Sequence, residues 1–203
     1  MTRVTFGMYR KGAREPTTTL RSVAAGADFT PPTPMPTATA AIVRHHREGP
    51  VGAAAAMDRS YRNSSYWGKR GTPQAGWADA MRRCYATYAD LTRNDSRPHF
   101  ALGLNRDLAL PPNELGVYID VVLIDPGGYV PRIVLWDTNA LTPALAAQYG
   151  APVWRVAEDE LGDDRVPRVE IWSLRAPTLM TLSADDARTA LPTVDQIVAR
   201  LVS

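Results

Sequence analysis

Apolar side chains recur at helical spacing between residues 77 and 91. In the stretch WADAMRRCYATYADL they lie three or four residues apart, which places them on one face of an α-helix. Arg82 and Arg83 lie off this apolar stripe. The pattern therefore predicts a helix that packs on a core and turns both arginines outward. Its apolar positions are Trp77, Met81, Cys84, Tyr85, Tyr88 and Leu91.

Short apolar runs bounded by turn residues predict four strands in the second half of the chain. ELGVYIDVVLID (114–125) and YVPRIVLWDT (129–138) flank Pro126-Gly127-Gly128, a sequence typical of a tight turn, and together predict a hairpin. PRVEIWSLR (167–175) and TLMTLS (178–183) predict two further strands.

Two more helices are predicted around these strands. Residues 142–162 have a helical pattern with an expected break at Gly150-Ala151-Pro152 and a stop at Gly162. VDQIVARLV at the end of the sequence predicts a last helix, with Thr193 as its N-cap. The order is helix, hairpin, helix, strand, strand, helix. It predicts a mixed α/β fold with a central sheet flanked by helices.

The first 60 residues carry a weaker pattern. Residues 16–40 are rich in Pro, Thr and Ala with few large apolar residues, which predicts an extended arm or linker. Residues 41–60 predict one or two short helical turns, broken at Gly49-Pro50. We therefore expect residues 1–60 to be an arm, partly extended, and residues 61–203 to be an α/β domain.

Composition places the chain among ordinary globular proteins. Of its 203 residues 45% are hydrophobic and 22% charged, and Cys84 is the sole cysteine. No apolar run approaches the roughly 20 residues that span a membrane, and the N-terminal residues lack the apolar stretch of a signal peptide. A lone cysteine fits a reducing compartment. We expect a cytoplasmic protein with no membrane segment.

Charge is divided unevenly along the chain. Residues 1–106 hold 16 Lys and Arg against 7 Asp and Glu, a net charge of +9, whereas residues 107–203 hold 7 against 14, a net charge of −7. Such a division predicts a basic surface that could contact nucleic acid. Alternatively, the two halves attract each other and the charges are spent within the protein.

Two of the predicted strands carry a carboxylate. Asp120 lies inside the first strand, four residues after Gly116, and Asp137 ends the second strand, RIVLWDTN. This arrangement, followed by a helix and another strand, resembles the PD-(D/E)XK nuclease superfamily and its RecB-type exonuclease branch. The resemblance covers roughly residues 70–175.

The branch has Gly-x-x-Asp on its first strand, an acid-x-Lys-Thr-Gly run on its second, and Gln-x-x-x-Tyr on the next helix. Here Leu135 falls at the position of the second acid and Asp137 at that of the lysine. The remaining positions are partly kept: Thr138 matches, Trp136 keeps an aromatic place, Asn139 replaces the glycine, Leu145 replaces the glutamine and Tyr149 keeps the tyrosine.

The resemblance implies a site in which two carboxylates hold Mg²⁺ and a lysine positions or activates water. Leu135 cannot bind a metal ion and Asp137 cannot supply a positive charge. We therefore predict a catalytically degenerate domain that acts as a nucleic-acid-binding or scaffolding subunit, beside a helicase or an active nuclease. One alternative is an active Mg²⁺-dependent DNase that uses Asp120, Asp137 and another acid. A second is a protein-interaction module without a nucleic-acid role.

Several residues also have a purely structural interpretation. Asp120 would then be a hydrogen-bonded residue within the strand, and Asp137 would cap the turn into the next helix. His45 and His46, beside Arg44 and Arg47, are expected to form an exposed basic patch. Glu170 is expected to face solvent or to pair with Arg168.

The best candidate for nucleic-acid contact is the stretch SSYWGKRGTPQAGW (64–77). Lys69 and Arg70 are surrounded by aromatic residues there, a combination suited to phosphate contact and base stacking. Together with Arg82 and Arg83 they are the predicted DNA-binding residues. The alternative is a loop whose aromatic side chains pack under the sheet.

Overall fold

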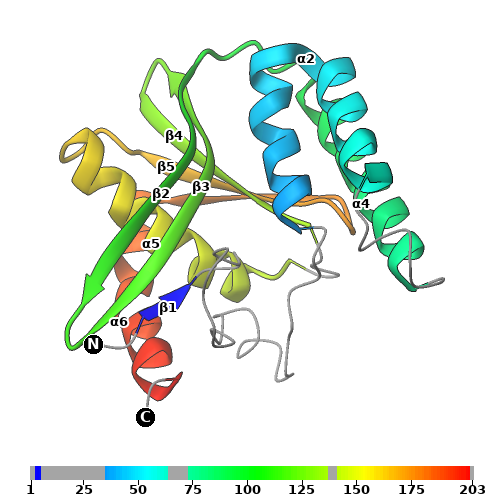
Figure 1. The fold of residues 1–203 in the computed structure, drawn as a ribbon. Coiled ribbons are helices and arrows are strands. Elements are labelled where there is room, and N and C mark those ends of the chain that lie inside the picture. The colour runs from blue at the N-terminus through cyan, green and yellow to red at the C-terminus, as the bar shows by residue number, and fades with distance from the viewer. Residues whose placement is uncertain (1–2, 6–34, 64–72, 137–140, 202–203) are drawn as a thin grey trace.

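The structure is a computed structural model, and it describes residues 3–5, 35–63, 73–136 and 141–201. Within these ranges the chain forms six strands and four helices (Figure 1). The predicted mixed α/β fold, a central sheet flanked by helices, is confirmed. Among the described residues, no helix is long and apolar enough to cross a membrane.

The described strands form one mixed sheet. Five of them follow the order β2-β3-β4-β5-β6, and β1 pairs with β3 in addition. Neighbours are antiparallel except for β4 with β5 and β1 with β3, which are parallel. The strands are β1 (Arg3–Thr5), β2 (His99–Leu110), β3 (Asn113–Asp125), β4 (Gly128–Leu135), β5 (Arg168–Ser173) and β6 (Thr178–Ser183).

One edge of β3 is shared by two partners. β2 pairs with β3 along nearly its whole length, so β4 and β1 must use the opposite edge. The β4 pairing ends at Val121 with Arg132, whereas β1 pairs with residues 114–116. β3 and β4 therefore separate at Asp120, one residue beyond their last pair.

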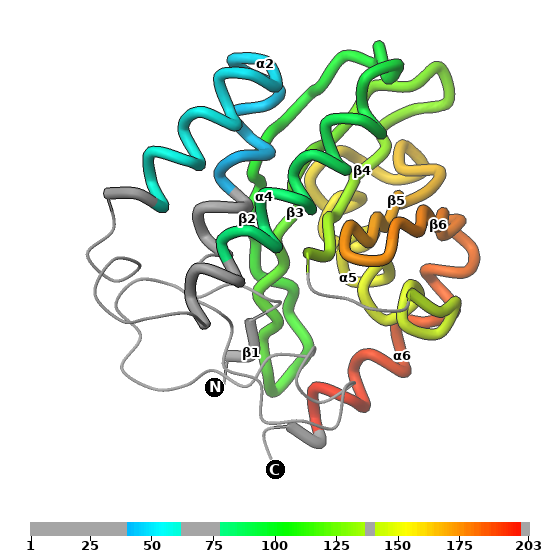
Figure 2. Tube along the Cα trace, turned by 90° about the vertical axis from the view of Figure 1, so that its right-hand side faces the viewer, coloured from blue at the N-terminus to red at the C-terminus, as the bar shows by residue number. Residues whose placement is uncertain are grey.

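The helices cover both faces of the sheet (Figure 2). On one face, α5 and α6 pack over a cluster that contains Leu135, Trp154 and Ile171. On the other, α2 and α4 pack over a cluster that contains Tyr88 and Trp172. The helices are α2 (Met35–Asn63), α4 (Pro73–Thr92), α5 (Pro143–Leu161) and α6 (Ala184–Leu201).

Helix α2 differs from the arm with short helical turns that the sequence predicted. It runs for 29 residues, and Ile42, Ala53 and Met57 are buried in the core. The predicted break is present as a bend, because Gly49 has a φ of 81° inside the helix. A run of four alanines gives little apolar contrast between helix faces, so the core-facing side of α2 was hard to see in the sequence.

Three other elements also differ from the prediction. α6 begins at Ala184 and runs through Thr193, so Thr193 is not its N-cap. β2 was missed, because its exposed Asn105, Arg106 and Asp107 interrupt the apolar alternation of an edge strand. α5 continues through the expected break at Gly150-Ala151-Pro152. Gly150 is needed for packing, since a Cβ atom there would lie 2.8 Å from Leu182 Cδ2.

Two adjacent glycines in the turn between β3 and β4 provide a matched stability test. Gly128 has a φ of 129°, and a Cβ atom there would lie 2.4 Å from the backbone oxygen of Arg165, whereas a Cβ at Gly127 would meet nothing within 4 Å. Gly128→Ala should lower the free energy of unfolding by about 2 kcal/mol or more, and Gly127→Ala should change it by less than about 0.5 kcal/mol. Denaturant unfolding measures both. Equal effects would contradict the described turn.

Candidate functional site

Asp120 lies where β3 and β4 separate, and its carboxylate fills the gap in the ladder. The side chain is 4% exposed, and its Oδ2 accepts a hydrogen bond from the Val134 amide at 2.8 Å. Leu135, at the position of the second acid, is buried in the apolar cluster beneath α5. The carboxylate thus has a structural role, and the position predicted for the second acid holds an apolar side chain of the core.

The other predicted site residues are only partly described. Asp137, Lys69 and Arg70 lie outside the described residues. Arg82 pairs with Asp58 and with Asp79, each at 2.6 Å, and these carboxylates balance its charge. Arg82 therefore does not form a site with Asp120. Its neighbour Arg83 is exposed on α4.

A buried guanidinium is the main polar feature that the sequence analysis missed. Arg132, on β4, is 0% exposed. Its Nη2 lies 2.5 Å from Asp95 Oδ2 and 2.8 Å from Glu170 Oε2, and the group lies 3.6 Å from the centre of the Trp172 ring. Arg97 joins both carboxylates at 2.8 and 2.7 Å. We call Arg132, Asp95, Glu170 and Arg97 the Arg132 network.

The prediction that Glu170 faces solvent or pairs with Arg168 was therefore wrong. Glu170 is buried beside Arg132 on the parallel neighbour strand, while Arg168 pairs with Asp125. A basic and an acidic residue inside two otherwise apolar strands were the available sequence signal. Only the register of the sheet shows that they meet.

The Arg132 network keeps its carboxylates ionised. Hydrogen bonds from Arg97, followed by those from Arg132, hold the pKa of Asp95 well below its usual range. Burial alone would raise the Glu170 pKa, but Arg97 and Arg132 outweigh it and hold that pKa below its ordinary value. Both carboxylates thus stabilise the fold above the pKa values of an unfolded chain, and this contribution is lost as pH falls through their lowered folded pKa values.

His45 and His46 do not form the exposed basic patch that was expected. His45 Nδ1 lies 3.0 Å from the Tyr85 hydroxyl, and His46 Nε2 lies 2.7 Å from the Tyr88 hydroxyl. Burial, followed by the nearby His45 and Arg132, lowers the pKa of His46 to about 4. His46 is therefore uncharged at neutral pH, and both rings serve to attach α2 to α4.

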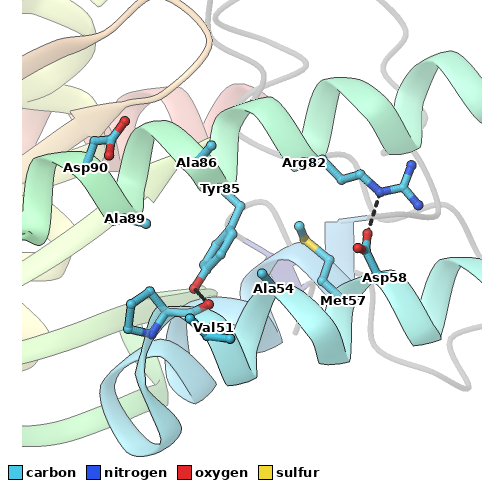
Figure 3. A pocket seen from close by; sticks show the side chains of 10 residues that line it. Val51, Ala54, Met57, Asp58, Arg82, Tyr85, Ala86, Ala89 and Asp90 are labelled. Atoms are coloured by element: carbon cyan, nitrogen blue, oxygen red, sulfur yellow. Dashed lines mark hydrogen bonds and ion pairs between the residues drawn. The ribbon is translucent and has the colours of Figure 1, made fainter.

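An apolar hollow opens between α2 and α4, which run antiparallel to each other (Figure 3). It has a volume of about 440 Å³. Val51, which is 82% exposed, stands at its edge. We call this hollow the groove. Its lining residues are Pro50, Val51, Ala54, Met57, Asp58, Arg82, Tyr85, Ala86, Ala89 and Asp90.

Known proteins give no family for this chain. In comparisons by sequence, no family model matches it, and no curated protein matches it significantly. Among the described residues, no group of three His, Cys, Asp or Glu side chains is placed to hold a metal ion.

The structural role of Asp120 predicts a graded response to substitution. Asp120→Ala should lower the free energy of unfolding by about 1–3 kcal/mol, because the buried Val134 amide loses its acceptor. Asp120→Asn should cost less, because the amide oxygen can still accept this bond. Denaturant unfolding measures the series.

A metal site would give another result in the same measurement. Millimolar Mg²⁺ should then stabilise the wild type more than NaCl of equal ionic strength does, and Asp120→Asn should abolish the difference. That outcome would contradict the structural role.

Proposed function

We propose that this chain is a non-catalytic binding domain that holds a helix of a partner protein in the groove between α2 and α4. The observation that carries the proposal is the groove itself, with Val51 standing exposed at its edge. A large apolar residue that is exposed beside an apolar hollow is typical of a contact surface.

The non-catalytic part is supported by how Asp120 and Leu135 are used. Asp120 accepts a backbone hydrogen bond, and Leu135 packs in the core, so a Mg²⁺ ion at this point would have one carboxylate at most from the two positions. Mg²⁺ held by so few protein oxygens is bound weakly. A scaffolding role, which needs no metal ion, is consistent with this arrangement.

The shape of the groove favours a helical partner. Ala54, Ala86 and Ala89 are small residues among its lining, so large apolar side chains from outside have room between the two helices. Met57 adds a flexible apolar surface that adapts to such side chains. An amphipathic helix meets these conditions, with apolar residues three and four positions apart.

Charge at the groove favours a basic partner. Asp58 and Asp90 line it, and Asp79 stands beside Arg82. Arg82 offsets one of these three carboxylates. Arg93 forms a highly exposed pair with Asp90, and such a pair contributes little. Lysine or arginine on the polar face of the partner helix would complement this rim.

Designed peptides test the groove directly. A labelled helical peptide of leucine and lysine, with leucines spaced by three and four, should bind more tightly than the same peptide with glutamate in place of lysine. Val51→Asp should weaken binding of the lysine peptide about tenfold, because an apolar contact of the order of 1.5 kcal/mol is lost. Fluorescence anisotropy measures the affinities.

Leu179→Asp is the matched control, since Leu179 is a 51% exposed apolar residue on β6 that does not line the groove. It should leave peptide binding unchanged. Equal losses in the two variants, or equal binding of the two peptides, would mean that the groove is not the contact surface.

Nucleic-acid binding is the second candidate, favoured by a different observation. Arg47, Arg59 and Arg83 are exposed on α2 and α4, and among the described residues none has a carboxylate within 4.0 Å. Arginines without acidic partners are available to phosphates. The resemblance to PD-(D/E)XK nucleases favours DNA as that ligand.

Salt dependence tests this second candidate. If DNA binds here, Arg59→Ala/Arg83→Ala should weaken binding and lower the slope of log affinity against log salt by up to about two, because each phosphate contact releases counterions. Arg82→Ala should change the slope less, since Asp58 and Asp79 already balance that charge. An unchanged slope in the double variant, measured by filter binding, would remove DNA as a ligand of this surface.

A further inference from the structure

The attachment of His46 to Tyr88 has a fixed hydrogen-bond direction. Tyr88 is fully buried, and among the described residues His46 Nε2, at 2.7 Å, is the acceptor beside its hydroxyl. A buried hydroxyl whose proton has no acceptor is costly, so Tyr88 donates to His46 Nε2. His46 Nε2 is then the acceptor, and this requires an uncharged ring.

Arg132 has an unused hydrogen-bond donor near Tyr88. Its Nη1 is buried and makes no hydrogen bond. The guanidinium nevertheless lies close enough to Tyr88 to favour a lower pKa of the Tyr88 hydroxyl. A proton on His46 Nε2 would therefore leave the Tyr88 proton without this acceptor and would add a second positive charge near Arg132. Both effects oppose protonation while α2 remains in place.

Burial, followed by Arg132, lowers the pKa of His45 too, but its hydrogen bonds suit either charge state. Its Nδ1 lies 3.0 Å from the Tyr85 hydroxyl and its Nε2 lies 3.0 Å from Thr92 Oγ1. Both hydroxyls also have carbonyl acceptors, Pro50 for Tyr85 and Tyr88 for Thr92. A doubly protonated His45 could donate to both hydroxyls, so its hydrogen bonds do not exclude the charged form.

Charged and titratable groups from several elements surround His46. His45 lies on the same helix, His99 on β2 has its ring 5.9 Å from that of His46, and Arg132 is on β4. Asp95, in the segment after α4, is the acidic group that favours protonation of His46. Asp95 is already engaged by Arg97 and Arg132, so the positive groups dominate.

We propose that His46 is an acid-sensitive latch, and that protonation of its Nε2 releases residues 41–48 of α2 from α4 and the sheet. The proton comes from solvent, and the hydrogen bond from Tyr88 is the bond that is lost. Release is confined by the bend at Gly49, where α2 already departs from helical geometry.

The latch also bears on the groove, and this extension rests on the proposed function. Tyr85 donates to the Pro50 carbonyl at 3.0 Å, contacts His45 and lines the groove. When residues 41–48 leave α4, the wall formed by Pro50 and Val51 loses its support from that side. Peptide binding in the groove should therefore weaken in acid.

The pH window follows from the direction of the His46 shift. The folded pKa, about 4, lies below the ordinary value of 6.5, so the stabilisation is complete above pH 6.5 and falls as pH decreases toward 4. Asp95 and Glu170 have lowered pKa values and stay ionised through most of this window. Changes near pH 5 therefore report on histidine.

Hydrogen exchange of the full chain at pH 7.5 and pH 5.0, corrected for intrinsic exchange rates, tests the latch. The opening equilibrium constant of residues 41–48 should be roughly tenfold larger at pH 5.0 than at pH 7.5. The lowered His46 pKa would give a larger factor for a fully buried ring, but this ring is partly open to solvent. The exchange of α5 should change little. His46→Gln, whose side-chain oxygen can still accept from Tyr88, should abolish the increase. His99→Gln, which alters an exposed ring, should retain most of it.

Equal protection at the two pH values, or an unchanged increase in His46→Gln, would overturn the latch. Titration of the His46 ring by NMR is the second measurement, and it stays informative if the variant is unstable. A midpoint well below 6 supports the latch, and a midpoint at 6.5 overturns it.

Peptide binding at both pH values separates the two proposals. Release of residues 41–48 with unchanged peptide affinity would support the latch and overturn only its link to the groove. If no peptide binds at either pH, the proposed function fails while the exchange result still decides the latch.

Discussion

The need to balance one buried positive charge organises the α2 and α4 side of this fold. Arg132 is 0% exposed, and a charge so placed is tolerated only when it is paired and hydrogen-bonded. Asp95 and Glu170 provide the pairing, one from the segment after α4 and one from β5. Removing one partner of such a buried pair typically costs about 3–5 kcal/mol, because an uncompensated charge remains. The Arg132 network therefore fixes α4, β4 and β5 relative to one another.

The same charge acts on the attachment of α2. The buried Tyr88 hydroxyl has its acceptor in His46 Nε2, and burial, His45 and Arg132 all lower the pKa of His46. A residue on β4 thus disfavours protonation of a residue on α2. Burial of Ile42 and Met57 supplies the apolar part of the same contact. The polar part makes this contact sensitive to pH, which apolar burial alone would not do.

Much of the fold could be predicted from the sequence, because its elements have strong periodicity. The hairpin around Gly127 and the helix that carries Tyr88 follow directly from apolar spacing. The candidate site could not be predicted in the same way. Arg132 and Glu170 have meaning only as neighbours in a parallel register, and the groove joins Val51 to Ala86 from two helices whose contact no local pattern reveals. Such features depend on tertiary placement rather than on propensity.

The separation of β3 from β4 explains how one carboxylate at this point can have either of two roles. A fork between two strands leaves backbone amides without ladder partners, and a carboxylate can serve there either as a metal ligand or as a hydrogen-bond acceptor. Asp120 is used as an acceptor by the Val134 amide, and the second acid position holds a buried leucine. The described polar groups around the sheet are thus largely engaged in holding the protein together. The apolar groove between α2 and α4, with Val51 exposed at its edge, supports the proposed binding role.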